Sequence, residues 1–212
     1  MTGNNAAPIL LLITAPSGAG KTTLCQNLIN ADTGVDRVIT CTTRPPRENE
    51  VQGVDYHFLD NKTFVKGIQE GEFLEHASVY GNHYGTRRKD VTRHFEDGHD
   101  VLLNIDVQGA ESVRKQANLD ATLRDSLVTV FLSPPSLNEL ENRLRNRNSD
   151  DEATILKRLA HAKKEIENWK LFDYLIVSGS RSQDLEKIQS ILRSERLKSA
   201  RQRLPESICG AN

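Results

Sequence analysis

The sequence predicts an α/β protein whose core is a mainly parallel β-sheet flanked by helices. Short continuous apolar runs recur along the chain, and longer helical patterns separate them, an alternation that is typical of parallel sheets with helices on both faces. The first run is followed by a glycine-rich loop and a helix, which is how a βαβ unit begins. The chain has 212 residues, a length that suits one domain with smaller inserted lobes.

The apolar runs are the candidate strands, because a strand buried on both faces is continuously apolar. They occupy residues 9–14, 101–105, 128–132 and 174–177. The candidate helices occupy residues 22–30, 136–147, 153–170 and 183–203. The last helix is expected to pack through an amphipathic stripe made of Leu185, Ile188, Leu192 and Leu197.

Two stretches interrupt this alternation. Residues 37–96 mix short β-like runs with polar turns, and residues 134–159 are highly charged and open with Pro134-Pro135. Their lower apolar content indicates lobes inserted on the core rather than separate domains. A single domain covering residues 1–212 is therefore expected, with a core made of residues 1–36, 97–133 and 160–212.

Composition and charge exclude several classes of protein. The 28 basic and 29 acidic residues give a formal net charge of -1, which argues against a nucleic-acid partner. No apolar run approaches the ~20 residues of a membrane span, and residues 9–13 lack the flanks of a signal peptide. The three cysteines form no CxxC pair and the six histidines show no HxxxH spacing, so a structural metal site is not expected. We expect a cytoplasmic protein with no membrane partner.

The strongest local signal is a candidate phosphate-binding loop after the first strand. It reads Ala15-Pro16-Ser17-Gly18-Ala19-Gly20-Lys21-Thr22-Thr23 and matches G-x-x-x-x-G-K-[ST], except that Ala15 replaces the first glycine. Gly18 and Gly20 would let backbone N–H groups surround a phosphate. Lys21 would reach the β- and γ-phosphates of a nucleotide, and the Thr22 hydroxyl would ligate Mg²⁺.

This loop does not identify the reaction. A glycine-rich turn that only joins a strand to a helix is the alternative, but the strand before it and the helix after it favour phosphate binding. Kinase, ATPase, GTPase and nucleotide-gated switch all remain open at this point, although no N-K-x-D segment supports a GTPase. The second substrate has to be sought elsewhere in the chain.

Residues 40–86 carry candidate groups for a second substrate. Arg44 and Arg47 are separated by a stiff Pro-Pro spacer and could grip one phosphate group. Further along the chain are a carboxylate at Glu75, a phenol at Tyr84 and a hydroxyl at Thr86. Each has an ordinary structural alternative when taken singly: solvated loop charges for the arginines and core aromatic rings for the tyrosines.

Taken together, these segments resemble guanylate kinase, a P-loop nucleoside-monophosphate kinase. The matching pieces are APSGAGKTT, TTRPPRENE with GVDY, FLEHA, YGNHYGT, IDVQGA and the PPS that opens the charged stretch. The resemblance implies a P-loop nucleoside-monophosphate kinase fold with a mixed α/β GMP-binding lobe at residues 37–96 and a helical lid at residues 134–159. It also implies Mg²⁺-dependent transfer of the γ-phosphoryl group of ATP to GMP, giving ADP and GDP.

The resemblance also implies roles for individual residues. A clamp on the GMP phosphate would be formed by Arg44, Arg47, Tyr56 and Tyr84. Guanine would be read by Thr40, Glu75 and Thr86. Asp106, at the end of a strand, would contribute to substrate binding, and an aspartate that only forms the turn before Gln108-Gly109 is the simpler alternative. Charge on the moving phosphoryl group would be stabilised by Lys21, Arg143, Arg147 and Arg158.

Three positions depart from the family pattern, and two other functions stay open. Asn104 replaces an aspartate, Asn148 replaces a glycine after the lid arginine, and Ser178 stands where an Asn-Asp pair usually begins. A catalytically weak guanylate-kinase-like interaction module is one alternative, and a phosphorylated-sugar kinase on the same core is another. The intact Gly20-Lys21-Thr22 argues against the first, and the candidate guanine-reading residues argue against the second. The sequence does not predict an oligomeric state.

Overall fold

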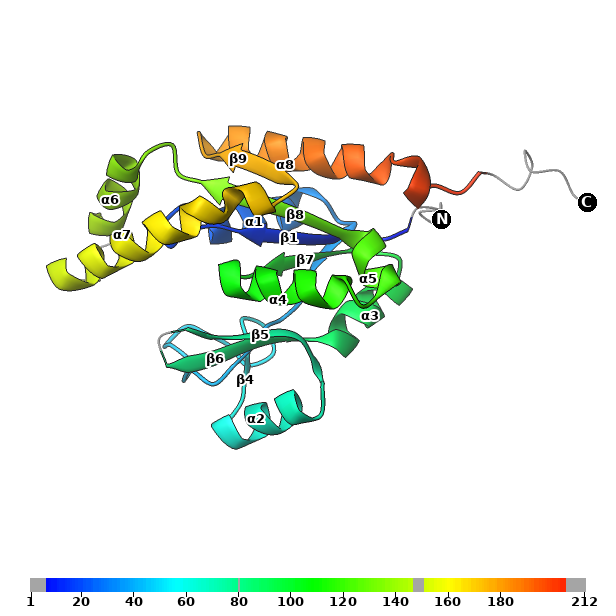
Figure 1. The fold of residues 1–212 in the computed structure, drawn as a ribbon, viewed down its shortest axis with the longest axis horizontal. Coiled ribbons are helices and arrows are strands. Elements are labelled where there is room, and N and C mark those ends of the chain that lie inside the picture. Colours follow the sequence, from blue (N-terminus) through cyan, green and yellow to red (C-terminus); the bar gives the residue numbers. More distant parts are fainter. Residues whose placement is uncertain (1–6, 80, 147–150, 205–212) are drawn as a thin grey trace, which may run out of the picture.

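The computed structural model describes residues 7–79, 81–146 and 151–204. Within this part of the chain, the core is a parallel sheet in the order β2-β7-β1-β8-β9 (Figure 1). Its strands are β1 (Leu10–Thr14), β2 (Val35–Arg37), β7 (Asp100–Asn104), β8 (Leu127–Ser133) and β9 (Tyr174–Val177). The four apolar runs of the sequence are confirmed as strands, and β2 is an additional edge strand.

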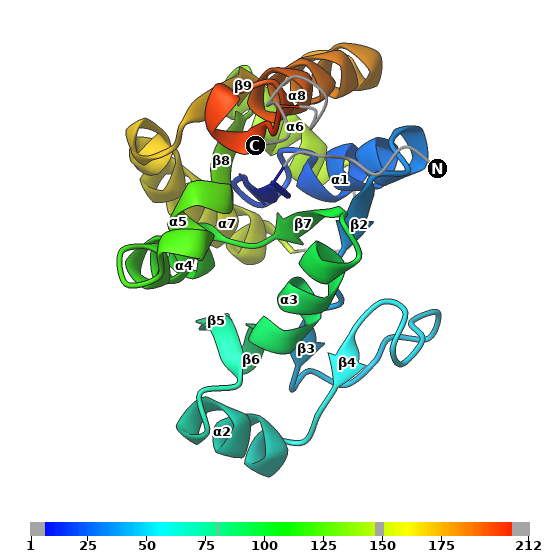
Figure 2. The same cartoon turned by 90° about the vertical axis from the view of Figure 1, so that its right-hand side faces the viewer.

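Helices cover both faces of this sheet (Figure 2). Leu11 and Ile13 of β1 point to the face covered by α1 (Lys21–Ala31) and α8 (Arg181–Arg196). Leu10 and Leu12 point to the opposite face, which is covered by α3 (Arg88–Glu96), α4 (Val107–Ala117) and α5 (Ala121–Ser126). All four side chains are fully buried, so β1 forms the centre of two cores, and the loop that leaves its carboxyl end starts from a rigid support.

A second, smaller sheet lies below the core in Figure 1, in the order β4-β3-β6-β5. Its elements are β3 (Cys41–Thr42), β4 (His57–Phe58), α2 (Asn61–Gln69), β5 (Phe73–Val79) and β6 (Asn82–Arg87). The sheet is mixed, because β3 pairs with β4 in parallel and with β6 in antiparallel orientation. Its small apolar core is centred on a stack of Phe64 on Phe73, with ring centroids 4.5 Å apart.

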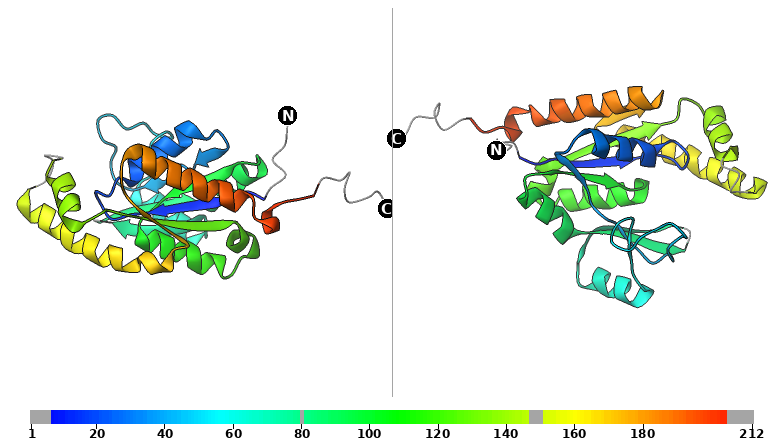
Figure 3. Two further views of the ribbon diagram at one scale, coloured as in Figure 1. Left: turned by 90° about the horizontal axis from the view of Figure 1, so that it is seen from above. Right: turned by 180° about the vertical axis from the view of Figure 1, so that it is seen from behind.

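A pair of helices, α6 (Leu137–Arg145) and α7 (Glu152–Ile166), extends beyond the carboxyl ends of the core strands (Figure 3). They pack on each other through Leu140, Leu144, Ile155 and Ala162. Helix α7 runs without a break through residue 159, the expected end of the lid, and continues into the 3₁₀ turn η1 (Glu167–Leu171). Arg147 and Asn148 lie outside the described residues.

The end of the last helix was predicted wrongly. Helix α8 ends at Arg196 rather than at residue 203, and Leu197 is 75% exposed instead of continuing the apolar stripe. Arg196 donates to Asp32 and Asp100 at 2.8 and 2.7 Å, which ties the helix end to the core. The chain then forms the 3₁₀ turn η2 (Ser199–Arg201), whose Arg201 carbonyl accepts from the Ala7 N–H at 2.7 Å. The chain therefore turns back to the core at this point instead of continuing as a helix.

Among the helices of the described residues, none is both long and apolar enough to cross a membrane.

Candidate active site

The loop after β1 has the backbone geometry that phosphate binding requires. Gly18 and Gly20 adopt φ angles of 94° and 98°, in the left-handed region that glycine reaches without strain. Gly20 is the N-cap residue of α1 and provides no side-chain cap, so the first N–H groups of the helix are left to an outside acceptor. Helix α6 packs closely on this loop, because a Cβ added to Gly18 would lie 2.9 Å from Leu140 Cδ1.

Lys21 is held by the core sheet. Its Nζ donates to the Ile105 carbonyl at 2.7 Å, and the same carbonyl accepts from the Thr14 hydroxyl at 3.2 Å. Burial lowers the pKa of Lys21 below its ordinary value. The ammonium therefore lies where β1 and β7 end side by side, beneath the phosphate-binding loop.

A cavity of about 510 Å³ opens over this loop, and we call it the loop cavity. Its other walls come from the end of β5, the start of α4 and one face of α7, with the side chains of Ser78, Val79, Asp106, Gln108, His161 and Glu165. The exposed Thr22 also lines it. Asp106 caps α4 by accepting from the Gly109 N–H at 2.8 Å, so it forms a turn, as the simpler interpretation held, and also faces the cavity.

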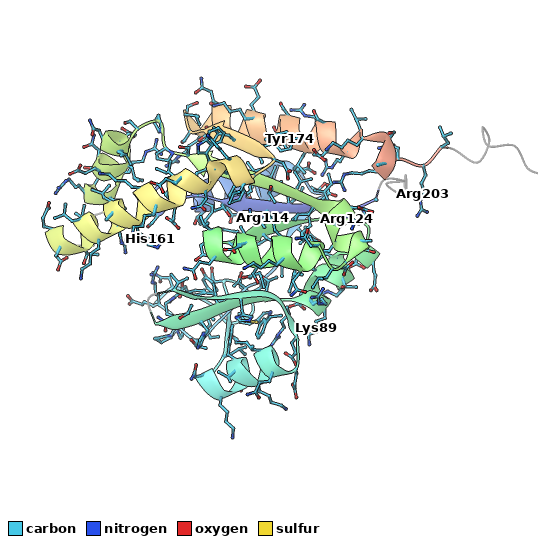
Figure 4. The ribbon with its side chains drawn as sticks, in the orientation of Figure 1. Lys89, Arg114, Arg124, His161, Tyr174 and Arg203 are labelled. Atoms are coloured by element: carbon cyan, nitrogen blue, oxygen red, sulfur yellow. The ribbon has the colours of Figure 1, made fainter. Side chains whose placement is uncertain are left out.

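His161 and Glu165 were missed by sequence reasoning. His161, labelled in Figure 4, has its Nδ1 3.4 Å from Glu165 Oε2. Burial raises the pKa of Glu165 above its ordinary value. Positions 158, 161 and 165 share one face of a helix, so the helical pattern could have grouped these two residues with Arg158. Arg158 is half-buried on α7.

A second cavity of about 170 Å³, the lobe cavity, lies between the small sheet and the core. Four of the predicted substrate residues line it together with Asp106, namely Thr40, Tyr56, Glu75 and Tyr84. Arg37 and Asn104 line it as well. Asp106 and Val79 line both the loop cavity and the lobe cavity, so the two spaces meet there.

Glu75 is the buried acid of the lobe cavity. Only 3% of its surface is exposed, and burial raises its pKa to about 7. Its Oε1 accepts from the Thr86 hydroxyl at 2.7 Å. On the other side α4 approaches closely, because a Cβ added to Gly109 would lie 2.9 Å from Glu75 Oε2. Since the one hydroxyl proton of Thr86 is used by Glu75, it is not available to a guanine oxygen in this structure.

The predicted phosphate clamp is only partly assembled. The Arg44 guanidinium lies 5.4 Å from the centre of the Tyr56 ring, and the Tyr56 and Tyr84 rings lie 6.2 Å apart. Arg44 also donates to Glu50 Oε1 at 2.8 Å. Arg47 is exposed, does not line the lobe cavity, and donates its backbone N–H to Glu50 Oε2 at 2.8 Å. Glu50, which sequence reasoning passed over, thus holds both arginine positions.

A third cavity, of about 400 Å³, lies on the other side of the phosphate-binding loop, between α1, α6 and α8. Arg143 lines it, with its Nε donating to Glu139 at 2.9 Å and its Nη1 directed at the Ala19 carbonyl at 3.4 Å. Ser178 lines it too, and its hydroxyl donates to the buried Asp184 at 2.9 Å. The Ser178 hydroxyl is therefore bound by Asp184, a second residue of this cavity that sequence reasoning missed.

A metal ion in this site would have to be coordinated jointly by the protein and by a bound phosphate ligand. The described residues contain no group of three or more His, Cys, Asp or Glu side chains that could hold a metal ion. Thr22 and Asp106 nevertheless offer oxygen atoms to the same loop cavity. Oxygen donors suit Mg²⁺, which commonly takes one or two protein ligands and completes its shell with phosphates and water. The residues present fit a phosphate-bound Mg²⁺.

Comparison with known proteins points to one family. The family model described as guanylate kinase matches residues 7–195. The guanylate kinase of Maricaulis maris is 45% identical over 193 residues, which cover 91% of this chain and 86% of that protein. The guanylate kinase of Alcanivorax borkumensis is also 45% identical over 193 residues, covering 91% and 90%.

Solved structures agree with this family. The crystal structure of guanylate kinase from Anaplasma phagocytophilum matches with a TM-score of 0.75 at 31% identity, over 93% of this chain and 90% of that chain. A shikimate kinase from Bacteroides thetaiotaomicron, with a TM-score of 0.50 at 15% identity, shares the fold alone. With a family match that spans most of the chain, this protein belongs to the guanylate kinase family, the P-loop nucleoside-monophosphate kinases that transfer a phosphoryl group from ATP to GMP.

Proposed function

We propose that this chain carries out Mg²⁺-dependent phosphoryl transfer with ATP in the loop cavity and GMP in the lobe cavity. The observation that carries the proposal is that the two cavities meet at Asp106 and Val79. A γ-phosphoryl group on the phosphate-binding loop and an acceptor phosphate in the lobe cavity would therefore face each other across a short gap. Phosphoryl transfer needs positioning and charge stabilisation rather than a covalent intermediate.

On the donor side, residues 15–23 bind the phosphates of ATP through backbone N–H groups at the start of α1. Lys21 releases the Ile105 carbonyl, 2.7 Å away, and donates to the β- and γ-phosphates instead. Thr22 would hold Mg²⁺ together with the phosphates and water, and the cation would supply charge neutralisation there. The nucleoside of ATP occupies the third cavity, beside Arg143 and Ser178.

On the acceptor side, Glu75 selects guanine. An ionised carboxylate accepts from both the N1–H and the 2-amino group of guanine, whereas adenine presents a lone pair at N1 and has no 2-amino group. Because Glu75 is buried, an unpaired charge there would be costly, and adenine is rejected. Thr40 and Thr86 contact the base, and Asp106 binds substrate from the core side. Arg44, Arg47, Tyr56 and Tyr84 grip the GMP phosphate.

Closure brings the remaining cations to the phosphates. We propose that the small sheet within residues 37–96 and the helix pair within residues 134–159 move as lobes, while Arg37 and α3 stay on the core. Arg143, Arg147 and Arg158 stabilise the charge on the transferred group when the site is closed. Closure also excludes water, which would otherwise hydrolyse ATP. The buried free thiols of Cys25 and Cys41 suit a reducing compartment, so we propose that the protein works in the cytoplasm.

The test is ADP formation from Mg-ATP by the purified protein, with GMP compared against AMP, CMP, UMP and no acceptor. Turnover that requires GMP and Mg²⁺ is the expected result. Saturable GMP binding without turnover would favour an interaction module. Turnover with a phosphorylated sugar and none with GMP would favour the small-molecule kinase.

A further inference from the structure

Arg37 stands at the junction between the core and the inserted lobe, outside every segment that carries the family resemblance. It is the last residue of β2, after which the chain leaves the core sheet for the small sheet. Its side chain is half-buried and lines the lobe cavity beside Thr40, Tyr56 and Glu75. A cation placed there needs an explanation, because Val35, two residues earlier on the same face of this strand, is apolar and buried.

The Arg37 guanidinium reaches across to the loop that carries Tyr56. Its Nη2 donates to the Asp55 carbonyl at 2.8 Å, from a position 18 residues earlier in the chain. Asp55 directly precedes Tyr56, whose ring lies against Arg44 and near Tyr84. The contact therefore joins an edge strand of the core to the backbone of the phosphate clamp.

The loop at residues 51–56 is otherwise closed mainly on itself. The Asp55 N–H donates to the Val51 carbonyl at 3.0 Å, and the Val51 N–H donates to the Asp55 carboxylate at 2.8 Å. The Gly53 N–H donates to the Tyr56 carbonyl at 2.8 Å. These bonds fix the shape of the turn without fixing its position relative to the core. Arg37 supplies a charge-assisted bond from the core, and such bonds are among the stronger hydrogen bonds in proteins.

From this geometry we infer that Arg37 is a positioning residue for the acceptor nucleotide: it holds the Tyr56 loop at the distance from the core at which the clamp fits a GMP phosphate. The inference rests on the proposed placement of GMP in the lobe cavity. It gives the Tyr56 loop an anchor on the core sheet, beside the core residues Asn104 and Asp106 that line the same cavity, and so links acceptor binding directly to the core.

The experiment compares R37M with wild-type protein and with R124M. Methionine keeps much of the length of the side chain but removes its charge and its donors. Arg124 on α5, labelled in Figure 4, is an exposed arginine paired with Asp125 and serves as the matched control. We expect R37M to raise the KM for GMP about tenfold, in keeping with the loss of a hydrogen bond to a charged group. The KM for ATP should stay within about twofold, and R124M should match wild type.

Two further variants separate positioning from general damage. R37K keeps the charge on a side chain without the fork of donors and should fall between wild type and R37M. Y56F removes the Tyr56 hydroxyl, and R37M should have less effect on the KM for GMP in a Y56F background than alone, because both act through one loop. Thermal unfolding of each variant shows whether it is folded. If R37M is not folded, the comparison is made with R37K.

The inference is overturned if folded R37M keeps a KM for GMP within twofold of wild type. Equal increases in the KM for GMP and for ATP would also overturn it, since that result indicates a general loss of structure. Additive effects of R37M and Y56F would show that Arg37 does not act through the Tyr56 loop. Wild-type turnover with GMP is measured in the same series, so failure of the inference is distinguishable from failure of the proposed function.

Discussion

The phosphate-binding loop and the lobe cavity are held in shape by different means. The loop is formed by backbone, with Gly18 and Gly20 at positive φ and a start on the fully buried β1. The lobe cavity is formed by side chains from elements far apart in the sequence, and the small sheet behind it rests on a core of a few residues around Phe64 and Phe73. Substitutions should therefore affect the two regions differently.

A backbone-built site keeps its shape when one side chain is removed, and it loses only the chemistry of that side chain. A side-chain-built site loses the positions of its neighbours as well, because each group is held by another. Glu75 is held by Thr86, Arg44 by Glu50, and the Tyr56 loop by Arg37. Losses in the lobe cavity should thus appear in GMP binding, and losses at the loop should appear in turnover.

The largest effect is expected from Lys21→Ala. Removing the ammonium should lower kcat by roughly 10²–10³-fold, the cost of losing one preorganised charge at a transition state, while the thermal midpoint changes little. Lys187→Ala is the matched control, because Lys187 also donates to a backbone carbonyl, that of Val177, at 2.8 Å. Steady-state kinetics with both variants would decide. Turnover near the wild-type level in the Lys21 variant would remove the basis for the donor assignment.

The next largest effect is expected from Glu75→Gln. Glutamine offers one acceptor oxygen and two N–H donors, and those donors would meet the N1–H or the 2-amino group of guanine. We expect kcat/KM for GMP to fall by roughly a hundredfold or more, with the KM for ATP little changed. Steady-state kinetics measures these constants, and isothermal titration with GMP and with an ATP analogue measures the accompanying loss of affinity. If both nucleotides lost affinity equally, Glu75 would be supporting the fold rather than reading the base.

The difference between the two regions also explains what the sequence could predict. The phosphate-binding loop is a contiguous segment, so its strand, glycines and lysine could be recognised one after another in the sequence. The structure has the strand, the loop and the helix in that order. The residues that line the lobe cavity were predicted from the resemblance to guanylate kinase, because no local sequence pattern connects Thr40 with Glu75. Their partners were not predicted, because Glu50, Gly109 and Arg37 act through contacts that exist only in the folded chain.

The limits of helices were harder to predict than their existence. Leu197 continued a helical spacing, yet α8 ends one residue earlier, where Arg196 is bound by Asp32 and Asp100. That end is set by residues 96 and 164 positions away in the sequence, and the hydrophobic periodicity of the helix carries no information about them. His161 and Glu165 were missed for another reason: in a charged stretch, a helix face turned to a cavity has the same pattern as one turned to solvent.

The pH dependence of GMP binding should reveal the ionisation of Glu75, with an effect smaller than that of Glu75→Gln. Because burial raises its pKa to about 7, the carboxylate that guanine needs is lost below neutral pH, and affinity for GMP should fall about tenfold between pH 8 and pH 6. The GMP phosphate titrates in this range too, so Glu75→Gln is the control and should retain only the dependence due to the phosphate. Identical pH profiles for the two proteins would contradict the assignment.

The same shift predicts the opposite trend for the unliganded protein. A carboxyl with a raised folded-state pKa gives stability that is complete below its unfolded pKa of 4.5 and is lost as pH rises through about 7. The difference is on the order of 3 kcal/mol. Thermal unfolding from pH 4.5 to pH 8 should show wild type losing stability relative to Glu75→Gln. GMP binding and unliganded stability would then change in opposite directions over the same interval.

Glu50→Gln should give the smallest effect. The Glu50 carboxylate pairs with the Arg44 side chain and accepts from the Arg47 N–H, both at 2.8 Å, and the Arg44 and Glu50 side chains are 16% and 17% exposed. Bonding to Arg44 holds the pKa of Glu50 below its ordinary value, so the carboxylate is charged at neutral pH. A half-buried pair of this kind contributes on the order of 1 kcal/mol, and the KM for GMP should rise a few-fold.

Glu70→Gln provides the matched control, because its pairing with Lys66 is far more exposed, at 50% and 69%, and should leave both KM values unchanged. A few-fold rise for GMP alone in the Glu50 variant would show that the lobe cavity depends on side chains that do not touch the substrate. A lower KM for GMP would mean instead that Glu50 competes with the GMP phosphate for Arg44. In that case the clamp would be assembled by the substrate, and the contrast with the preformed phosphate-binding loop would be stronger still.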